Sequence, residues 1–226
     1  MNGVNELENN LKTCHERYHS IIEEAFSEYW RKYLIKGEYN SGEFLTLLST
    51  PRDVFIEFCR ENQLNYSSVA GTILEWTIFH FIKAGLSATE KDKTASVVNR
   101  YTIPFKWKTK GNKQVRIDIV IKSNKTKKQY YAFEAKTNFE DGFKKFREEE
   151  KLIYHHRRKN FKHFKYYYLS LNLPPQEFEK KFKRDIKRLI GRKELYILNK
   201  HSGNFPGIDA FLKSIVASIS NIKEML

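Results

Sequence analysis

Three charged residues near the middle of the chain, Asp118, Glu134 and Lys136, have the types and spacing that metal-dependent phosphodiester cleavage requires. Asp118 interrupts a run of isoleucine and valine, and Glu134 and Lys136 end a second apolar run. Residues i and i+2 of a strand share a face, so Glu134 and Lys136 are predicted to point the same way. The polar segment 122–128 is typical of a hairpin loop, and the hairpin would set Asp118 beside Glu134. The apolar face of the first strand is predicted to consist of Ile117, Ile119 and Ile121.

The Glu-x-Lys spacing alone is a weak signal in a chain whose residues are 30% charged. The same acid-x-Lys spacing begins at Glu149, Glu179 and Asp185, in stretches predicted as helix. Its ordinary interpretation is a salt bridge on a solvated surface. Asp118 favours a functional interpretation. An acid within a core strand costs roughly several kcal/mol of folding free energy unless it is paired or bound to metal.

The hydrolysis of a phosphodiester needs an attacking water, charge neutralisation at the phosphate and help for the departing oxygen. One or two Mg²⁺ ions held by Asp118, Glu134 and the carbonyl of Ala135 would supply all three. Mg²⁺ keeps several waters and takes one or two carboxylates, so this sparse set of ligands is sufficient. Lys136 would orient the water, help to deprotonate it and stabilise negative charge on the phosphate.

These residues resemble the PD-(D/E)xK nuclease superfamily, and within it the Type II restriction endonucleases. Arg116-Ile-Asp118 stands in place of the usual Pro-Asp pair, and Glu134-Ala-Lys136 matches the (D/E)xK half. The segment Ser67–Glu75 resembles the helix that often carries a further acid, which here is Glu75. The resemblance implies an α/β fold with a restriction-endonuclease-like core, in which helices flank a mixed central sheet, and implies Mg²⁺ as cofactor. Glu75 would hold a metal-bound water or a second ion, and its alternative is a helix acid that faces solvent.

An N-terminal helical region, residues 1–66, is predicted to precede the nuclease core, residues 67–226. This region would form a dimer interface or embrace DNA. Its apolar spacing predicts one long or two shorter helices over Glu6–Ile35. Two short helices, Ser41–Leu48 and Pro51–Cys59, would follow, the second with Thr50 as its cap and proline at its first position.

The core is predicted to begin with a helix from Ser68 to Ala84 that ends at Gly85. The two strands of the hairpin would follow a first strand over Ser96–Lys108. The elements predicted after them are a helix at Phe143–Lys159, a strand at Phe164–Asn172, a helix at Pro175–Ile190, a strand at Glu194–Asn199 and a helix at Ile208–Met225.

The composition is typical of a protein that binds a polyanion. The chain has 41 Lys and Arg against 27 Asp and Glu, and a net charge of +14. Charge alone gives binding without sequence specificity, which must come from contacts to base edges. The residues predicted to contact double-stranded DNA lie beside the hairpin, in the basic stretch after it and in the loop after the last strand. They are Lys106, Lys108, Lys113, Arg116, Asn138, Arg157, Arg158, Lys162, Lys200, His201 and Asn204. For each, a solvated surface position is the alternative.

The N-terminus lacks the pattern of a secretory signal, and no apolar run approaches the roughly 20 residues that span a bilayer. We therefore expect no membrane association and a cytoplasmic location. The heavy use of Lys, Asn and Ile suggests an AT-rich genome and hence a bacterium. Cys14 and Cys59 are too isolated for a zinc cluster or a disulfide framework.

The leading hypothesis is a Mg²⁺-dependent Type II restriction endonuclease that cuts both strands of a short palindromic site as a homodimer, within a restriction-modification system. A junction resolvase or repair nuclease of the same superfamily is one alternative. A basic, non-catalytic DNA-binding protein with Asp118 and Glu134 in salt bridges is another. An HNH nuclease built from His155, His156, Asn160 and His163 is disfavoured, because these residues fall in a helix-to-loop stretch rather than on a ββα hairpin and the two Cys are far away.

Overall fold

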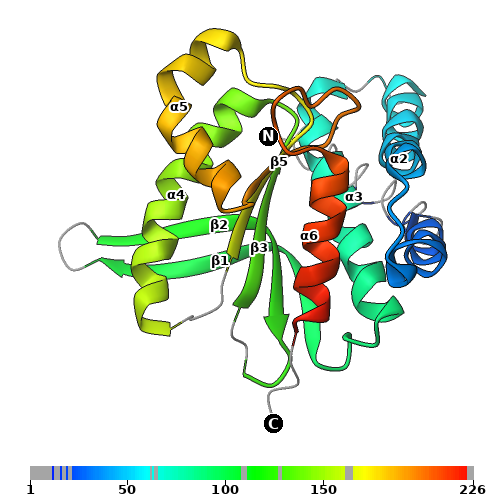
Figure 1. Cartoon of the computed structure of the whole chain (residues 1–226), viewed down its shortest axis with the longest axis horizontal. Helices are drawn as coiled ribbons and strands as arrows, with labels where there is room; N and C mark the ends of the chain where they lie inside the picture. The colour runs from blue at the N-terminus through cyan, green and yellow to red at the C-terminus, as the bar shows by residue number, and fades with distance from the viewer. Residues whose placement is uncertain are drawn as a thin grey trace.

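The computed structural model describes residues 12, 16, 19, 22–61, 63, 66–107, 111–126, 129–160 and 165–222. Its centre is a sheet with the strand order β1-β2-β3-β4-β5 (Figure 1). The strands are β1 (Ala95–Trp107), β2 (Gly111–Ser123), β3 (Gln129–Lys136), β4 (Lys165–Ser170) and β5 (Leu195–Ile197). Strands β1, β2 and β3 pair antiparallel, whereas β4 pairs parallel with both β3 and β5. The sheet is therefore mixed, and the predicted α/β class is confirmed.

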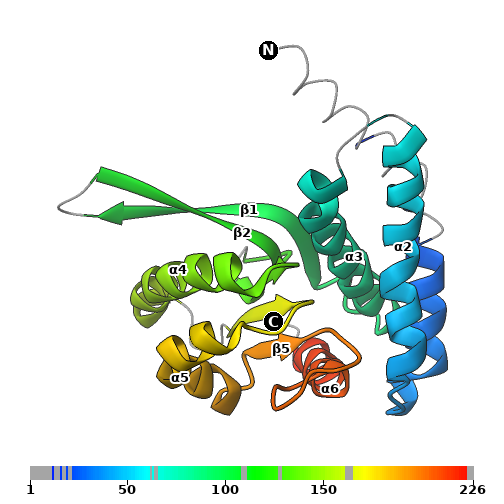
Figure 2. The same ribbon diagram turned by 90° about the horizontal axis from the view of Figure 1, so that it is seen from above.

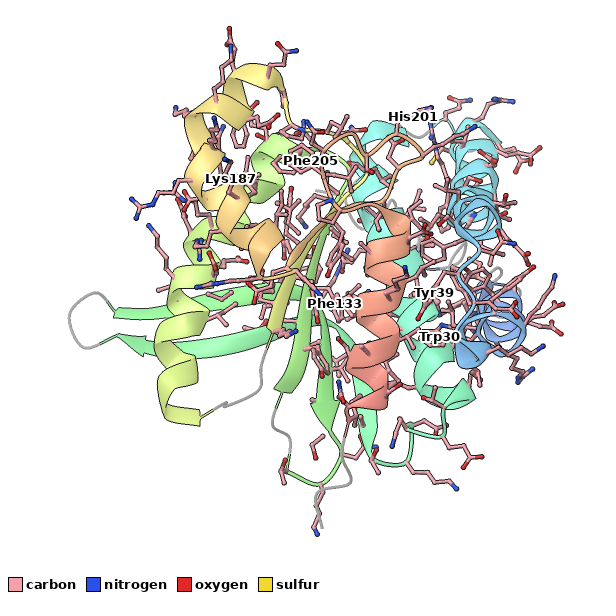
Figure 3. The ribbon with its side chains drawn as sticks, in the orientation of Figure 1. Trp30, Tyr39, Phe133, Lys187, His201 and Phe205 are labelled. Carbon is pink, nitrogen blue, oxygen red and sulfur yellow. The ribbon has the colours of Figure 1, made fainter. Side chains whose placement is uncertain are left out.

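Helices cover both faces of the sheet and divide the core into two layers (Figures 1 and 2). The first layer packs α3 (Tyr66–Ala88) and α6 (Ile208–Ser220) against the sheet, and Trp30 and Phe133, labelled in Figure 3, belong to it. The second layer packs α4 (Phe139–Asn160) and α5 (Gln176–Gly191) against the other face. Within the described residues, no helix is long and apolar enough to cross a membrane.

The N-terminal part is helical, as predicted, over residues 22–32, and the short η1 (Leu34–Lys36) follows. Most of residues 1–21 lie outside the described residues. The prediction of two short helices after it was wrong, because α2 (Ser41–Glu61) is continuous and contains Pro51. Proline removes one helical hydrogen bond. Packing outweighs this loss, since Phe44 and Phe55 are buried on either side of Pro51.

Helix α3 continues to Ala88, so the prediction that Gly85 ends it was also wrong. A Cβ at Gly85 would lie 2.4 Å from the ring of Trp30. The indole Nε1 of Trp30 donates to the carbonyl of Phe81, one turn earlier, at 2.9 Å. Glycine at this position therefore serves close packing between the N-terminal helices and α3.

The β1–β2 hairpin is longer than the rest of the sheet. Strand β2 pairs with β3 only from Ile119 to Lys122, so residues 111–117 pair with β1 alone. This outer part of the hairpin projects beyond the sheet as a two-stranded arm (Figure 2). Asp118 lies at the base of this arm. The regular pairing of β1 with β2 is interrupted there, between Arg100 and Asp118.

The backbone at Arg100 has a φ of +54°, which is uncommon for a residue with a side chain. The apolar face predicted for β2 is divided at the same place. Ile119 and Ile121 pack in the first core layer, whereas Ile117 packs in the second. The strict alternation expected of a regular strand is therefore broken beside Asp118.

Candidate active site

Asp118, Glu134 and Lys136 meet where the hairpin leaves the sheet. The pairing of Ile119 with Phe133 brings Asp118 of β2 to the position beside Glu134 of β3. The ammonium of Lys136 lies 2.5 Å from Oδ2 of Asp118 and 3.0 Å from Oε1 of Glu134. The backbone N–H of Ala135 also donates to Oδ2 of Asp118, at 3.1 Å. One lysine therefore bridges two acids from neighbouring strands.

Burial distinguishes this group from a surface salt bridge. Asp118 is 5% exposed and Glu134 is fully buried, while the side chain of Lys136 is 26% exposed. Burial and the charge of Asp118 raise the pKa of Glu134. Burial opposes the charge of Lys136, but Glu134 and Asp118 outweigh it and raise the pKa of the ammonium. The alternative of a solvated salt bridge on the sheet surface is therefore wrong.

Glu75 of α3 approaches the same group from the first core layer. It is 7% exposed, so the alternative that it faces solvent is also wrong. The guanidinium Nε of Arg100 lies 3.3 Å from Oε1 of Glu75. Burial and the charge of Asp118 raise the pKa of Glu75 to about 7, against the opposing effects of Arg100 and Lys136. Glu75 is thus electrostatically coupled to Asp118.

Helix α4 adds two residues that sequence reasoning missed. The ammonium of Lys145 lies 2.6 Å from Oε1 of Glu134 and 3.7 Å from Oε1 of Glu149. In the sequence, Glu149 stands out only as one of the other acids with Glu-x-Lys spacing. Burial and the charge of Glu134 raise its pKa to about 7. The available signal was the i, i+4 spacing of Lys145 and Glu149, which places both on one face of the helix that follows β3.

Tyr166 of β4 joins Glu149 to Glu134 from the sheet side. Its hydroxyl donates to Oε2 of Glu149 at 2.9 Å and lies 3.4 Å from Oε2 of Glu134. Burial, followed by the charge of Glu134, raises the pKa of the Tyr166 hydroxyl well above its ordinary value. It therefore remains protonated and acts as a donor across the physiological range.

The carboxylate oxygens suit a hard divalent cation. Asp118 accepts both of its hydrogen bonds at Oδ2, so Oδ1 has no donor among the described residues. Glu134 accepts from both lysines at Oε1, and only the long contact from Tyr166 reaches Oε2. In the described part of the chain, no cluster of three or more His, Cys, Asp or Glu has metal-binding geometry. An ion here would use two carboxylates with a carbonyl and water, which is a donor set that Mg²⁺ accepts.

Close packing holds Lys136 in place. A Cβ at Gly142 of α4 would lie 2.3 Å from Cγ of Lys136 and 2.6 Å from the hydroxyl of Tyr168. The same hydroxyl donates to the carbonyl of Phe139 at 2.7 Å, near the start of α4. Helix α4 can therefore approach β3 closely enough for Lys145 to reach Glu134.

The predicted DNA-contact residues fall into three places. Arg116 is exposed two positions before Asp118, and Lys106 and Lys113 belong to the two strands of the projecting arm. Arg157 and Arg158 belong to the last turns of α4, while Lys108 and Lys162 lie outside the described residues. The third place includes four exposed residues around the start of α4 and the loop after β5: Asn138, Lys200, His201 and Asn204.

Asn138 has a local structural role, because its Oδ1 accepts the backbone N–H of Glu140 at 2.9 Å in the first turn of α4. The loop after β5 is anchored to the same region by Phe205, whose ring centroid lies 6.1 Å from that of Phe139. His201 and Phe205 both belong to this loop (Figure 3). His155, His156 and Asn160 belong to α4, as the argument against an HNH site expected, and His163 lies outside the described residues.

Comparison with known proteins identifies no family. No family model matches the chain, and no curated protein matches it. Among solved structures, one described as protein VC1899 from Vibrio cholerae is 12% identical, with a TM-score of 0.40. The alignment covers 88% of this chain and 55% of that one, so the chain spans about half the length of the Vibrio protein.

Proposed function

We propose that the protein is a Mg²⁺-dependent endonuclease that hydrolyses phosphodiester bonds in double-stranded DNA. The observation that carries the proposal is the bridging of two buried carboxylates, Asp118 and Glu134, by the single ammonium of Lys136. A buried acid pair is costly unless it has a compensating charge and a use. The clustering of acids with raised pKa values around a mostly buried lysine is typical of catalytic sites.

Each residue has a distinct task in this proposal. Asp118, Glu134 and the carbonyl of Ala135 would hold the ion, which supplies Lewis acidity and lowers the pKa of bound water. Lys136, whose own pKa is raised, stays charged, orients the attacking water and stabilises negative charge on the phosphate. Glu75, with a pKa of about 7, can hold or release a proton at neutral pH beside Asp118.

Charge supports nucleic acid as the substrate. The segment 93–117, which includes β1 and the first part of β2, has seven Lys and Arg and no Asp or Glu. A two-stranded ribbon is narrow enough to enter the major groove of B-form DNA. Because the arm begins at Asp118, DNA bound along it would extend directly to the proposed site. The net charge of +14 gives the same preference over the whole chain.

The most specific form of the proposal is a Type II restriction endonuclease of the bacterial cytoplasm. Such an enzyme would cut a short palindromic site as a homodimer. Two-fold symmetric DNA requires one active site for each strand, and a two-fold dimer supplies them. The N-terminal helices pack outside α3, away from the arm, where they are available for a dimer interface (Figure 2).

Incubation of the protein with mixed plasmid DNA tests the proposal. With Mg²⁺ we expect discrete fragments, and with EDTA we expect intact DNA. Sequencing of the fragment ends would give the target and the position of the cut. The enzyme proposal fails if no divalent ion supports cleavage, which leaves a DNA-binding protein. Selective cutting of four-way junctions, with linear duplex left intact, would instead identify a resolvase.

A further inference from the structure

Lys145 differs from the other cations of α4 in where its ammonium lies. Its neighbour Lys144 pairs with Glu140 one turn earlier at 3.0 Å, with both side chains about half exposed, 52% and 41%. Lys145 instead contacts Glu134, whose side chain is 0% exposed, and its ammonium also lies 3.4 Å from the carbonyl of Arg116. One helix therefore provides an ordinary surface lysine and a lysine directed into the site.

Two lysines share one oxygen of Glu134. Lys136 and Lys145 lie 3.0 and 2.6 Å from Oε1, whereas Oε2 has only the long contact from Tyr166. The side chain of Lys136 is 26% exposed and that of Lys145 is 42% exposed. Lys136 is therefore the more buried cation of the pair, and Lys145 is the one more accessible to solvent.

The surrounding acids explain why the ammonium of Lys145 lies against Glu134. Four acids gather in this region, namely Glu75, Asp118, Glu134 and Glu149, and the cations among them are Arg100, Lys136 and Lys145. A divalent ion at Asp118 and Glu134 would add two positive charges. The attraction between Glu134 and Lys145 then weakens, and the flexible side chain of a half-exposed lysine is free to take another anion.

We propose that Lys145 is a second substrate-contacting lysine, which binds a non-bridging oxygen of the phosphodiester once Glu134 is neutralised by a divalent ion. This inference rests on the proposed function. It adds a phosphate contact from α4 to the roles proposed for Lys136. Glu149 and Tyr166 are positioning residues, because they act on the substrate only through Lys145 and Glu134.

DNA binding measured with Ca²⁺, in place of Mg²⁺ to prevent cleavage, and separately with EDTA tests the inference. For the wild type we expect tighter binding of a labelled duplex in Ca²⁺. In Lys145→Met we expect the affinity in Ca²⁺ to fall about 10- to 100-fold, the effect of one charge-assisted hydrogen bond. The affinity in EDTA should change much less. Lys144→Met, which removes the same charge one position away, should match the wild type, and Lys145→Arg should restore part of the binding.

Calorimetric titration of Ca²⁺ without DNA, together with thermal melting, separates this role from a structural one. We expect Lys145→Met to fold and to bind Ca²⁺ at least as well as the wild type, because the competing ammonium is gone. Equal DNA affinity of Lys145→Met and wild type in Ca²⁺ would overturn the inference alone. An equal loss in Ca²⁺ and EDTA would also overturn it. A wild type whose DNA binding and cleavage ignore divalent ions would overturn the proposed function, and this inference with it.

Discussion

Glu134 and Glu150 are both buried acids paired with cations, but their oxygens are used differently. Glu150 of α4 is 2% exposed and receives the guanidinium of Arg188 on both oxygens, at 2.7 Å each. Arg192 adds a contact to Oε1 at 3.3 Å. Glu134 takes two ammonium groups on one oxygen and leaves the other with a single long contact. Glu150 therefore fastens α5 to α4, whereas Glu134 has one oxygen that, among the described residues, only the hydroxyl of Tyr166 approaches.

The neighbours of the two acids differ as well. Glu150 pairs with Arg188 of α5 and with Arg192, which follows that helix. A planar guanidinium that binds both carboxylate oxygens is a stable partner. Glu134 has other acids around it, and the charge of Asp118 adds to burial in raising its pKa. Burial and pairing by themselves thus do not distinguish a site from an anchor. What distinguishes Glu134 from Glu150 is that one of its oxygens has only a long contact, and that other acids lie close to it.

The largest expected effect is the loss of cleavage in Asp118→Ala and Lys136→Ala. In the proposed mechanism Asp118 is a metal ligand and Lys136 is the cation that faces the phosphate, so either change should lower the rate by at least about 10³-fold. Plasmid cleavage measures the loss, and a DNA-binding assay should show that specific binding remains. Near-normal turnover of either variant would show that its residue has no part in the chemistry.

Substitution of Glu150 should lower stability and leave the cleavage rate unchanged. Glu150→Gln removes the charge that Arg188 and Arg192 bind, so the free energy of unfolding should fall by about 2–3 kcal/mol. Denaturant unfolding measures the change. Among the described residues the side chain of Glu150 pairs with Arg188 and Arg192 and not with Asp118, Glu134 or Lys136, so the cleavage rate per folded molecule should stay near the wild-type value. A large loss of rate in a folded Glu150→Gln protein would mean that the two acids are not as separate as the contacts indicate.

Sequence periodicity could predict the hairpin because Asp118 and Glu134 are placed by neighbouring strands. Period-two spacing and one short loop determine that geometry. Lys145 could not be assigned in this way, since its contact depends on how closely α4 crosses β3. Pro51 was misjudged for a related reason. Local rules favour a helix start there, but the buried phenylalanines on both sides hold one continuous helix.

The divided face of β2 was also beyond sequence reasoning. A regular strand would keep Ile117 with Ile119, whereas Ile117 packs in the other layer. The change coincides with the unusual backbone of Arg100, opposite Asp118. Departures from local rules concentrate at functional positions, where tertiary contacts outweigh regular geometry. The irregular strand therefore supports the same location for the site as the charges do.

Gly142→Ala tests how precisely Lys136 must be held. The new Cβ would lie 2.3 Å from Cγ of Lys136, so the lysine or α4 must shift. A displacement of about 1 Å at a catalytic group lowers rates by up to roughly 10²-fold, and we expect a loss of about 10- to 100-fold. The matched control is Gly191→Ala in α5, where a Cβ meets nothing within 4 Å. Equal cleavage by Gly142→Ala and wild type would show that the contact does not constrain the lysine.

The smallest expected effect is a pH-dependent change in the free energy of unfolding. Its sign for Glu75→Gln should be opposite to that for Glu150→Gln. The pKa of Glu75 is about 7 in the folded protein and near 4.5 ordinarily. Between these values the folded state holds more protons than the unfolded state, so stability falls as pH rises through this window. Glu75→Gln removes the cost and should stabilise the metal-free protein by about 1–2 kcal/mol at pH 8. Glu150→Gln, in contrast, destabilises.

Denaturant unfolding at pH 5 and pH 8, with and without Mg²⁺, measures this effect. At pH 5 folded Glu75 is mostly protonated, so the advantage of Glu75→Gln over the wild type should nearly disappear. Glu57→Gln, at an exposed position of α2, should change nothing at either pH. Mg²⁺ should stabilise the wild type more at pH 8, because ionised acids bind the ion and protonated acids do not. If Glu75→Gln were instead destabilising at pH 8, its ion pair with Arg100 would outweigh the repulsion from Asp118, and Glu75 would be an anchor like Glu150.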